Sequence, residues 1–335
     1  MKRLFTVFVI LVCFAPLSIA QQSIDFKISD GLNDNRLKYS IEASVSRLLT
    51  ELNLACQQGR SLQLGGINMT QEAVHSLNLL WNNLHFTCED SKILERCLTS
   101  VNGYQIRNIA IRVIPIYEGY DGRLERELTV SFSKKGEITG VRMAMESQVY
   151  SKILKSGDAV DLTRREEIVS FCEAFRSHYD EKDIEALNKV FSDDALIITG
   201  SVVMKRDYQG DQPKMRPEIV YRTQNKQEYL SRLKKNFDSK EYVKVTFSDY
   251  KVVRSGDNPN FYGVTLHQHW KAKSYKGNDY EDDGYVFLLW EFRENGEPPI
   301  VHVRTWQPDR IEGMPMPKEK IINIKDFEIP TKMKY

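Results

Sequence analysis

Two stretches of this chain repeat one pattern, and that repeat constrains the fold more than any other feature. Residues 127–145 read "ELTVSFSKKGEITGVRMAM", and residues 285–306 read "YVFLLWEFRENGEPPIVHVRTW". Each has an apolar strand, a charged turn that contains glycine, and a second strand that carries Arg142 or Arg304. Apolar strands joined by a short glycine-containing turn are typical of a β-hairpin. Each half of the chain is therefore predicted to contain the same antiparallel element.

Helical patterns precede both hairpins. Residues 36–58 and 164–179 carry apolar side chains at three- and four-residue steps, as expected of a helix that buries one face. Thr163 followed by Glu166 forms a capping-box pattern, so the second helix is expected to begin there. The later pattern predicts a strand over 195–204, a polar loop over 205–222, a helix over 226–236, and strands over 242–254, 261–274, 285–293 and 300–306. Helices followed by antiparallel strands indicate an α+β fold with the sheet around a long helix.

Residues 1–20 are expected to be a signal peptide. Lys2 and Arg3 precede an apolar run from Leu4 to Ala15, and small residues then lead to a cleavage site after Ala20. This run is shorter than the ~20 residues that a membrane-spanning helix needs, and no later stretch replaces it, so no transmembrane segment is expected. We expect an exported protein, in the periplasm or outside the cell, which could associate with the cell envelope.

The length predicts two domains. Removing 20 residues from 335 leaves 315, which suits two cores of ~150 residues each. We place the first domain at 21–154 and the second at 155–310, because a polar linker begins at Lys155. The tail, 311–335, is expected to lie across the first domain or to stay mobile.

The charge of the chain is nearly balanced. It has 47 basic and 46 acidic residues, so losing Lys2 and Arg3 changes the formal net charge from +1 to −1. No net field attracts nucleic acid, and we expect no nucleic-acid partner. No cofactor is expected, and the partner is an unidentified protein or small molecule.

Four cysteines remain beyond the signal peptide. Cys88 and Cys97 could form a disulfide if the chain bends between them, since one continuous helix would hold them ~13 Å apart. Cys56 and Cys172 lie among apolar residues and are interpreted as buried free thiols. No short Cys–x–x–Cys or Cys–x–x–His spacing indicates a zinc site.

The second half resembles the nuclear transport factor 2-like superfamily. The resemblance rests on "VSFCEAFRSHYDEKDIEALNKVFSDDALIITG", "YGVTLHQHWKAKSY" and "DDGYVFLLWEFRENGEPPIVHVRTWQPDR", within residues 163–310. Residues 23–154 look like a second, degenerate copy. The resemblance implies two domains, each with helices packed in a strongly curved antiparallel sheet. The superfamily includes ketosteroid isomerase, scytalone dehydratase and polyketide cyclases as well as noncatalytic binding domains, so it does not decide the function.

Two histidines in "TLHQHW" are candidates for a metal site. His267 and His269 share one face of a strand, and carboxylates from the next hairpin, Asp282 and Asp283, could converge on them. The opposite face holds Val264, Leu266 and Trp270, which makes it the core side. We therefore favour solvent-facing histidines over metal ligands.

The strand over 300–306 supplies further candidates. Alternation places Ile300, His302, Arg304 and Trp306 on one face. A buried arginine without a partner is costly, so Arg304 must meet a carboxylate, a carbonyl oxygen or an anionic ligand. Its recurrence as Arg142 favours a structural ion pair or a domain contact. The candidate ligand-binding residues are Arg304, Trp306, Trp270 and Tyr285, and the candidate acids or bases are His269, His302 and Asp283.

Two functional hypotheses follow. We favour a noncatalytic tandem module that binds a partner protein or a small ligand at the cell envelope, because no acid–base constellation is evident. The alternative is a small-molecule enzyme resembling ketosteroid isomerase or polyketide cyclase, with its site in the cone of the second domain. A cavity with an ionisable group at its wall would favour the enzyme.

Overall fold

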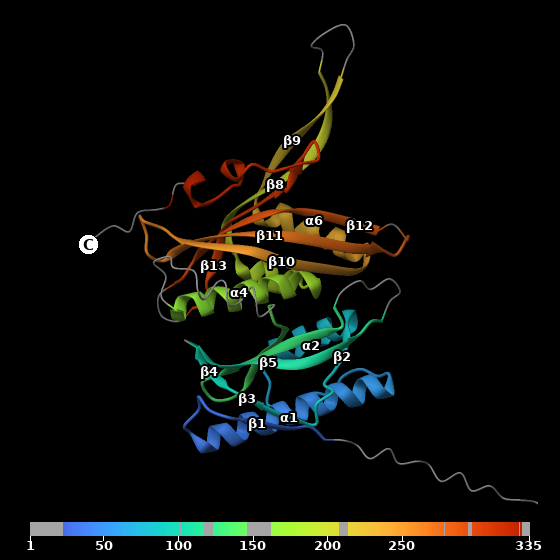
Figure 1. Ribbon diagram of the computed structural model, residues 1–335, viewed down its shortest axis with the longest axis vertical. Coiled ribbons are helices and arrows are strands. Elements are labelled where there is room, and N and C mark those ends of the chain that lie inside the picture. The colour runs from blue at the N-terminus through green and yellow to red at the C-terminus, as the bar shows by residue number, and fades with distance from the viewer. Residues whose placement is uncertain are drawn as a thin grey trace, which may run out of the picture.

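The computed structural model describes residues 23–100, 102–116, 123–145, 162–207, 214–277, 279–293, 297–327 and 329. The expected signal peptide and the predicted linker at Lys155 lie outside these residues. Two large hydrophobic cores are present among these residues, one formed by residues between 24 and 143 and one by residues between 145 and 301, and a smaller third cluster contains Phe261, Phe287, Leu289 and Val303. We call the described residues 23–143 the first unit and the described residues 162–329 the second unit. Figure 1 shows the two units stacked.

The second unit is a curved sheet around a central helix. Its helices are α4 (Leu162–Asp180), α5 (Ile184–Val190) and α6 (Lys226–Asp238). Its strands are β8 (Phe191–Asp207), β9 (Lys214–Gln224), β10 (Lys240–Arg254), β11 (Phe261–Ser274), β12 (Asp279–Glu291) and β13 (Ile300–Pro308). The strand order is β10-β11-β12-β13-β8-β9, and only β13 and β8 of these pair in parallel.

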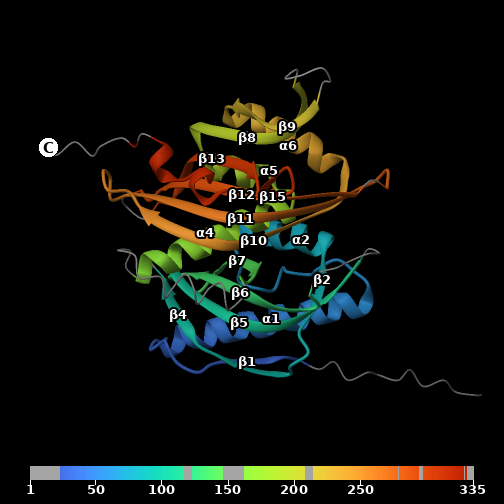
Figure 2. The ribbon, with the colours of Figure 1, turned by 45° about the horizontal axis from the view of Figure 1, so that its top comes forward.

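Aromatic packing explains why the sheet closes around α4. Phe175 and Tyr179 of this helix meet in edge contact, and Phe175 also packs against Phe191 and Trp290 from two strands. The two views agree that α4 lies between the sheet of the second unit and the first unit (Figures 1 and 2). The α+β class, with helices packed in a strongly curved antiparallel sheet, is confirmed.

The first unit also packs helices against a mainly antiparallel sheet. Its helices are α1 (Asn35–Gln58) and α2 (Gln71–Asn83). Its main sheet has the order β2-β5-β6-β7, from β2 (His85–Thr87), β5 (Gly103–Ile114), β6 (Glu125–Ser133) and β7 (Ile138–Met143), with β4 (Cys97–Ser100) also paired to β5. β1 (Asp25–Ile28) pairs in parallel with β3 (Lys92–Glu95). Both predicted hairpins are present, as β6–β7 and β12–β13.

Local signals define the ends of α1. The Asp34 carboxylate caps the first turn by accepting a hydrogen bond from the Leu37 amide. Gly59 ends the helix in the left-handed region, with φ of 60°, which glycine adopts without the steric cost of a Cβ.

Two sequence expectations about the second unit are wrong. Thr163 is not an N-cap, since α4 already includes Leu162. The expected loop over 205–222 is mostly the hairpin of β8 and β9, which projects from the unit in Figure 1. Val202, Met204 and Met215 on this hairpin are exposed. Because the projecting part has no buried face, its sequence lacks the alternation that identifies a strand.

The described part of the C-terminal segment, residues 311–327 and 329, packs on the second unit, whereas the tail was expected to lie across the first domain or to stay mobile. A short hairpin, β14 (Arg310–Ile311) with β15 (Met314–Pro315), precedes two short helices, η2 (Lys318–Lys320) and η3 (Ile324–Asp326). The ring of Phe327 then stacks on Phe287 with centroids 5.3 Å apart. This segment covers apolar side chains on the outer face of the sheet, among them Phe261, Leu289 and Val303.

The four cysteines that the structure describes are free thiols. Cys88, Cys97 and Cys172 are buried and Cys56 is half-buried, and none of them forms a disulfide. Cys88 Sγ lies 3.4 Å from the Ala110 carbonyl oxygen. Burial raises the pKa of Cys88 and of Cys97 to about 11, so both thiols stay protonated at neutral pH. Among the described helices, none is long and apolar enough to span a bilayer.

Charged side chains join the two units. Arg107 of β5 forms a bidentate pair with Glu173 of α4, at 3.0 and 2.6 Å, and both side chains are buried. Glu173 Oε1 also accepts a hydrogen bond from the Met145 amide at 2.6 Å. Arg176 donates to the Met143 carbonyl oxygen at 2.6 Å. We call these contacts the inter-unit seam.

Candidate functional site

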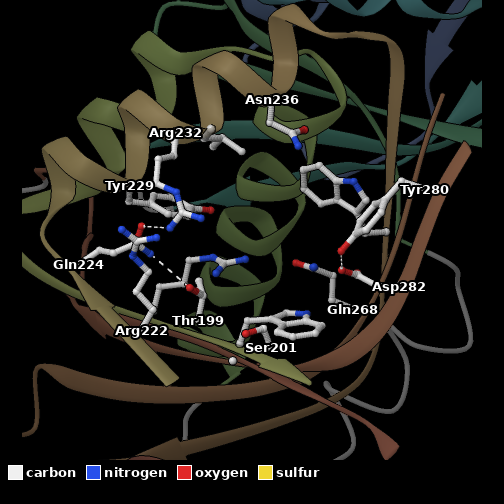
Figure 3. Close-up of a pocket in the computed structure, with 15 residues that line it drawn as sticks. Thr199, Ser201, Arg222, Gln224, Tyr229, Arg232, Asn236, Gln268, Tyr280 and Asp282 are labelled. Atoms are coloured by element: carbon white, nitrogen blue, oxygen red, sulfur yellow. Dashed lines mark hydrogen bonds between the residues drawn. The ribbon is translucent and has the colours of Figure 1, made fainter. Parts of the chain in front are cut away.

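A cavity of about 420 Å³ opens between α6 and the inner face of the sheet in the second unit. Its lining includes Thr199, Arg222, Gln224, Tyr229, Arg232, Gln268, Trp270, Tyr280, Asp282, Arg304 and Trp306. Figure 3 shows the labelled polar side chains arranged around this space. The cavity therefore draws on one helix and five strands.

Strand register determines which side chains face the cavity. Trp270 of β11 lies opposite Asp282 of β12, and Arg304 of β13 lies opposite Leu288. Because side chains alternate along a strand, Gln268 joins Trp270 on the inner face, and Trp306 joins Arg304 there. The Trp306 indole lies against Gly284, where a Cβ would come within 2.6 Å of the ring. A glycine is needed at this position for the indole to lie so close.

Arg304 is the central charged group of the cavity. It is 4% exposed, and its guanidinium carbon lies 5.3 Å from the ring centroid of Tyr229 and 5.8 Å from that of Tyr179. The two tyrosine hydroxyls share a hydrogen bond of 2.8 Å. Such rings stabilise a cation through their negative faces. No carboxylate among the described residues lies within 4.0 Å of this guanidinium, and its Nε has no hydrogen-bond partner.

Asp282 places a carboxylate in the same cavity. Its Oδ1 is buried without a hydrogen-bond partner, while the Tyr280 hydroxyl donates to its Oδ2. Burial raises the pKa of Asp282 above its ordinary value, against the lowering effects of Tyr280 and of the Arg304 charge. The side chain can therefore hold or accept a proton closer to neutral pH than an exposed aspartate can.

The rim of the cavity is held by a small hydrogen-bond network. Gln224 accepts a hydrogen bond from Arg232 at 2.6 Å and donates one to Thr199 at 3.2 Å (Figure 3). Deeper in the cavity, the donors Arg304 Nε and Trp306 Nε1 are buried without partners. Unused buried donors beside aromatic walls suit a ligand that carries acceptor oxygens.

Three of the four candidate ligand-binding residues come together in this cavity. Arg304, Trp306 and Trp270 all line it. Tyr285 lies elsewhere: its ring meets His267 in an edge contact, with centroids 5.3 Å apart, and His267 in turn lies 3.6 Å from Asp309.

His302 lies outside the cavity, and the expectation that it shares a face with Arg304 is wrong. The pairing of β12 with β13 shifts register between Leu289 and Trp290, so that Val301 points into the core instead. Such a bulge reverses the alternation on one side of it. His302 Nε2 instead contacts Glu291 Oε2 at 2.6 Å.

His269 and Asp283 contact each other on the outer face of the sheet. His269 Nδ1 lies 3.0 Å from Asp283 Oδ1, and its Nε2 lies 3.4 Å from Glu281 Oε1. None of the three candidate acids or bases therefore lines the cavity. In the part of the chain that the structure describes, neither His267 nor His269 belongs to a three-ligand metal cluster; that arrangement occurs at His178, Glu181 and Asp183.

Sequence reasoning missed Asp282 and Tyr229 as cavity residues; it placed Gln268 on the same face as Trp270 but did not single it out as a site residue. Asp282 could have been found from Trp270, which the alternation already placed on the core side, once the pairing of β11 with β12 was known. That pairing depends on the length of the turn, and the sequence pattern alone did not define where β12 begins. Tyr229 required the tertiary position of α6.

Comparisons with known proteins give fold-level likeness only. No family model and no curated protein matches the chain. Similar solved structures include a conserved protein from Planctomyces limnophilus, with 14% identity, 44% of this chain and 99% of that chain covered, and a TM-score of 0.34. A nuclear transport factor 2-like protein of unknown function in nutrient uptake from Rhodospirillum rubrum has 14% identity, 42% and 97% coverage, and a TM-score of 0.31.

A third similar structure is naphthalene 1,2-dioxygenase with indole bound in its active site. It has 9% identity, covers 50% of this chain and 92% of that chain, and has a TM-score of 0.37. At these scores the matches support no functional argument. The function of this chain is therefore inferred from its own cavity.

Proposed function

We propose that this protein is an exported, noncatalytic module of the cell envelope whose second unit binds a small ligand. The observation that carries the proposal is Arg304, a buried cation at the wall of a ligand-sized cavity with an unpartnered Nε. Leaving a buried donor unsatisfied costs ~1–3 kcal/mol, which a ligand acceptor would recover. The cavity volume falls within the ~300–1,000 Å³ typical of small-molecule sites.

The lining defines the chemical class of the ligand. Arg304 Nε and Trp306 Nε1 offer donors, while Trp270, Trp306 and Tyr229 offer ring surfaces. Arg222 and Arg232 add positive charge at the exposed rim. A ring compound bearing a carboxylate fits this combination, because it pairs an anionic acceptor with a flat apolar body.

Titration with aromatic carboxylates tests the proposal. Trp270 and Trp306 both line the cavity, so a bound ring compound should change the tryptophan fluorescence in a saturable way. Arg304→Met should weaken binding at least tenfold, since it removes the charge and the donor. Arg310→Met is the matched control, because Arg310 is 65% exposed and lies outside the cavity.

Two outcomes would contradict the proposal. If no acid in a broad panel of aromatic carboxylates gave saturable binding, the cavity would not be a site for this ligand class. If Arg304→Met and Arg310→Met weakened binding equally, the effect would be one of overall charge and not of the cavity.

Export is tested separately. The first residue of the protein recovered from outside the cytoplasm is expected to be Gln21 by mass spectrometry. Recovery of an intact Met1 end would refute the export part of the proposal and leave ligand binding unaffected.

A second candidate function is catalysis by Asp282. The specific observation is its carboxylate, which lies in the cavity with one oxygen unpartnered and a raised pKa caused chiefly by burial. A general base works best when its pKa approaches the working pH. Proton abstraction from carbon next to a ligand carbonyl is the reaction that this group could perform, with Arg304 facing the developing negative charge.

Deuterium exchange distinguishes the two functions. An aromatic keto acid that binds would be incubated with the protein in D₂O and followed by NMR. Catalysis predicts exchange of the acidic C–H that Asp282→Asn abolishes while binding persists. Exchange at the same rate in the wild type and in Asp282→Asn would leave the noncatalytic module as the function.

A further inference from the structure

A second cluster of reactive side chains lies where the two units meet, remote from the cavity lining. His178 near the end of α4, Glu181 in the following turn and Asp183 at the start of α5 place one ligand atom each within 4.8 Å of one another. His75, from α2 of the first unit, reaches the same cluster, with its Nε2 3.7 Å from Asp183 Oδ2.

The chain turns sharply to bring these groups together. Lys182 sits between Glu181 and Asp183 in the left-handed region, with φ of 56°. The amides of Glu181 and Asp183 donate to the carbonyl oxygens of Ser177 and His178, which continues the end of α4 into the turn. Asp183 then caps α5 by accepting a hydrogen bond at Oδ1 from the Ala186 amide at 2.9 Å. Its Oδ2 remains directed to the cluster.

Several ligand atoms of the cluster are buried and unused. Glu181 is 1% exposed, and its Oε1 has no hydrogen-bond partner, while its Oε2 accepts from Ser76 Oγ at 2.9 Å. His178 Nδ1 is also buried without a hydrogen-bond partner, 3.9 Å from Glu181 Oε2. Ser76 and the Ala186 amide orient the two carboxylates, as supporting hydrogen bonds do around metal ligands.

We propose that His75, His178, Glu181 and Asp183 form a zinc site that links the two units. Two imidazoles and two carboxylates are a ligand set that suits Zn²⁺. Tetrahedral zinc holds ligand atoms roughly 3.3 Å from one another, given metal–ligand distances of about 2.0–2.1 Å. The separations in the cluster are somewhat larger, so the side chains draw inward when the ion binds.

Some groups around the cluster favour a bound cation and one opposes it. His178 Nδ1 is buried without a hydrogen-bond partner and lies 3.9 Å from Glu181 Oε2, so it is placed to serve as a ligand atom. The Arg142 guanidinium faces the cluster from β7 and opposes a cation, while Glu181 and Asp183 supply two carboxyl groups to hold one. Arg142 has no ion pair within 4.0 Å to Glu181 among the described residues.

Calorimetry with Zn²⁺ alone, on the full chain after chelator treatment, tests the site. We expect one ion per chain, with an affinity that falls on the order of 100-fold in Glu181→Gln and in His178→Asn and at least tenfold in His75→Asn. The matched control is His269→Asn, since His269 also lies near two carboxylates but on the outer sheet face. This variant should bind as the wild type does.

Circular dichroism keeps the test decisive if one variant folds poorly. If Glu181→Gln misfolds, Asp183→Asn takes its place in the calorimetry. This variant retains the capping oxygen of α5 and removes only the charge. No saturable zinc binding by the wild type would overturn the proposal. Equal losses in His269→Asn and in the cluster variants would overturn it as well, and unchanged affinity in His75→Asn would overturn the link between the units.

Discussion

The inter-unit seam and the cavity of the second unit both bury arginines, but they satisfy them differently. Arg107 in the seam forms two hydrogen bonds to Glu173, at 3.0 and 2.6 Å. Arg304 in the cavity has aromatic rings on its faces, an unpartnered Nε, and no carboxylate of the described residues within 4.0 Å. A buried charge that is fully paired holds a structure together, whereas one that is left open is available to a ligand.

The largest expected effect comes from breaking the seam. Glu173→Ala removes the buried carboxylate that pairs with Arg107 and should lower the free energy of unfolding by ~3–5 kcal/mol. Urea denaturation measures the loss. Glu218→Ala is the control, because it removes the same side chain from the exposed pair with Lys205 and should cost at most ~1 kcal/mol. Similar losses in the two variants would refute the distinction between the seam and a surface pair.

The cavity arginine should behave in the opposite way. Arg304→Met replaces a buried charge that has no carboxylate of the described residues within 4.0 Å with an apolar side chain of similar length, so it removes a desolvation cost without breaking a close ion pair. We expect the midpoint of urea unfolding to stay constant or rise while carboxylate binding is lost. A loss of stability as large as that of Glu173→Ala would mean that Arg304 serves the fold and not a ligand.

The affinity for an aromatic carboxylate should depend on pH through Asp282. Its carboxylate repels an anionic ligand in the cavity, and burial raises its pKa above the ordinary value. As the pH falls through that raised pKa, Asp282 becomes neutral and the affinity for an aromatic carboxylate should increase several-fold, because the repulsion between two carboxylates is lost. Asp282→Asn should bind tightly with little pH dependence. Fluorescence titrations between neutral and mildly acidic pH measure this change. A wild type that binds more weakly in acid would contradict this account.

The smallest effect is expected outside the cavity. His302→Asn removes a partly exposed contact with Glu291 that is worth ~0–1 kcal/mol, and it should leave carboxylate affinity within twofold of the wild type. Parallel titration and urea denaturation check both values. A loss of binding comparable to that of Arg304→Met would contradict the placement of His302 on the outer face.

The sequence predicted the elements better than it predicted their faces. The helix over 36–58 and the strand over 261–274 were expected from periodicity and are observed with nearly these bounds. The core side of that strand was also correct, with Val264, Leu266 and Trp270 buried. Where burial is one-sided, alternation gives both the element and its orientation.

Alternation failed where the backbone is irregular or leaves the core. The bulge beside Val301 turned His302 outward, and no side chain in "PPIVHVRTW" indicates it. The hairpin of β8 and β9 was missed because its projecting part has no buried face. Asp282 and Tyr229 entered the cavity through strand pairing and helix packing, which depend on contacts between residues distant in the chain.

The polar character of the seam also bears on how the chain is made. The face of the first unit that receives α4 presents Arg107 and Gln105, and Gln105 donates to Ser170 of α4 at 3.4 Å. While the second half is still unfolded, this face meets water through charged and amide groups. Because these groups are readily hydrated, this part of the face tolerates exposure to water before α4 docks on it, which an apolar seam would not.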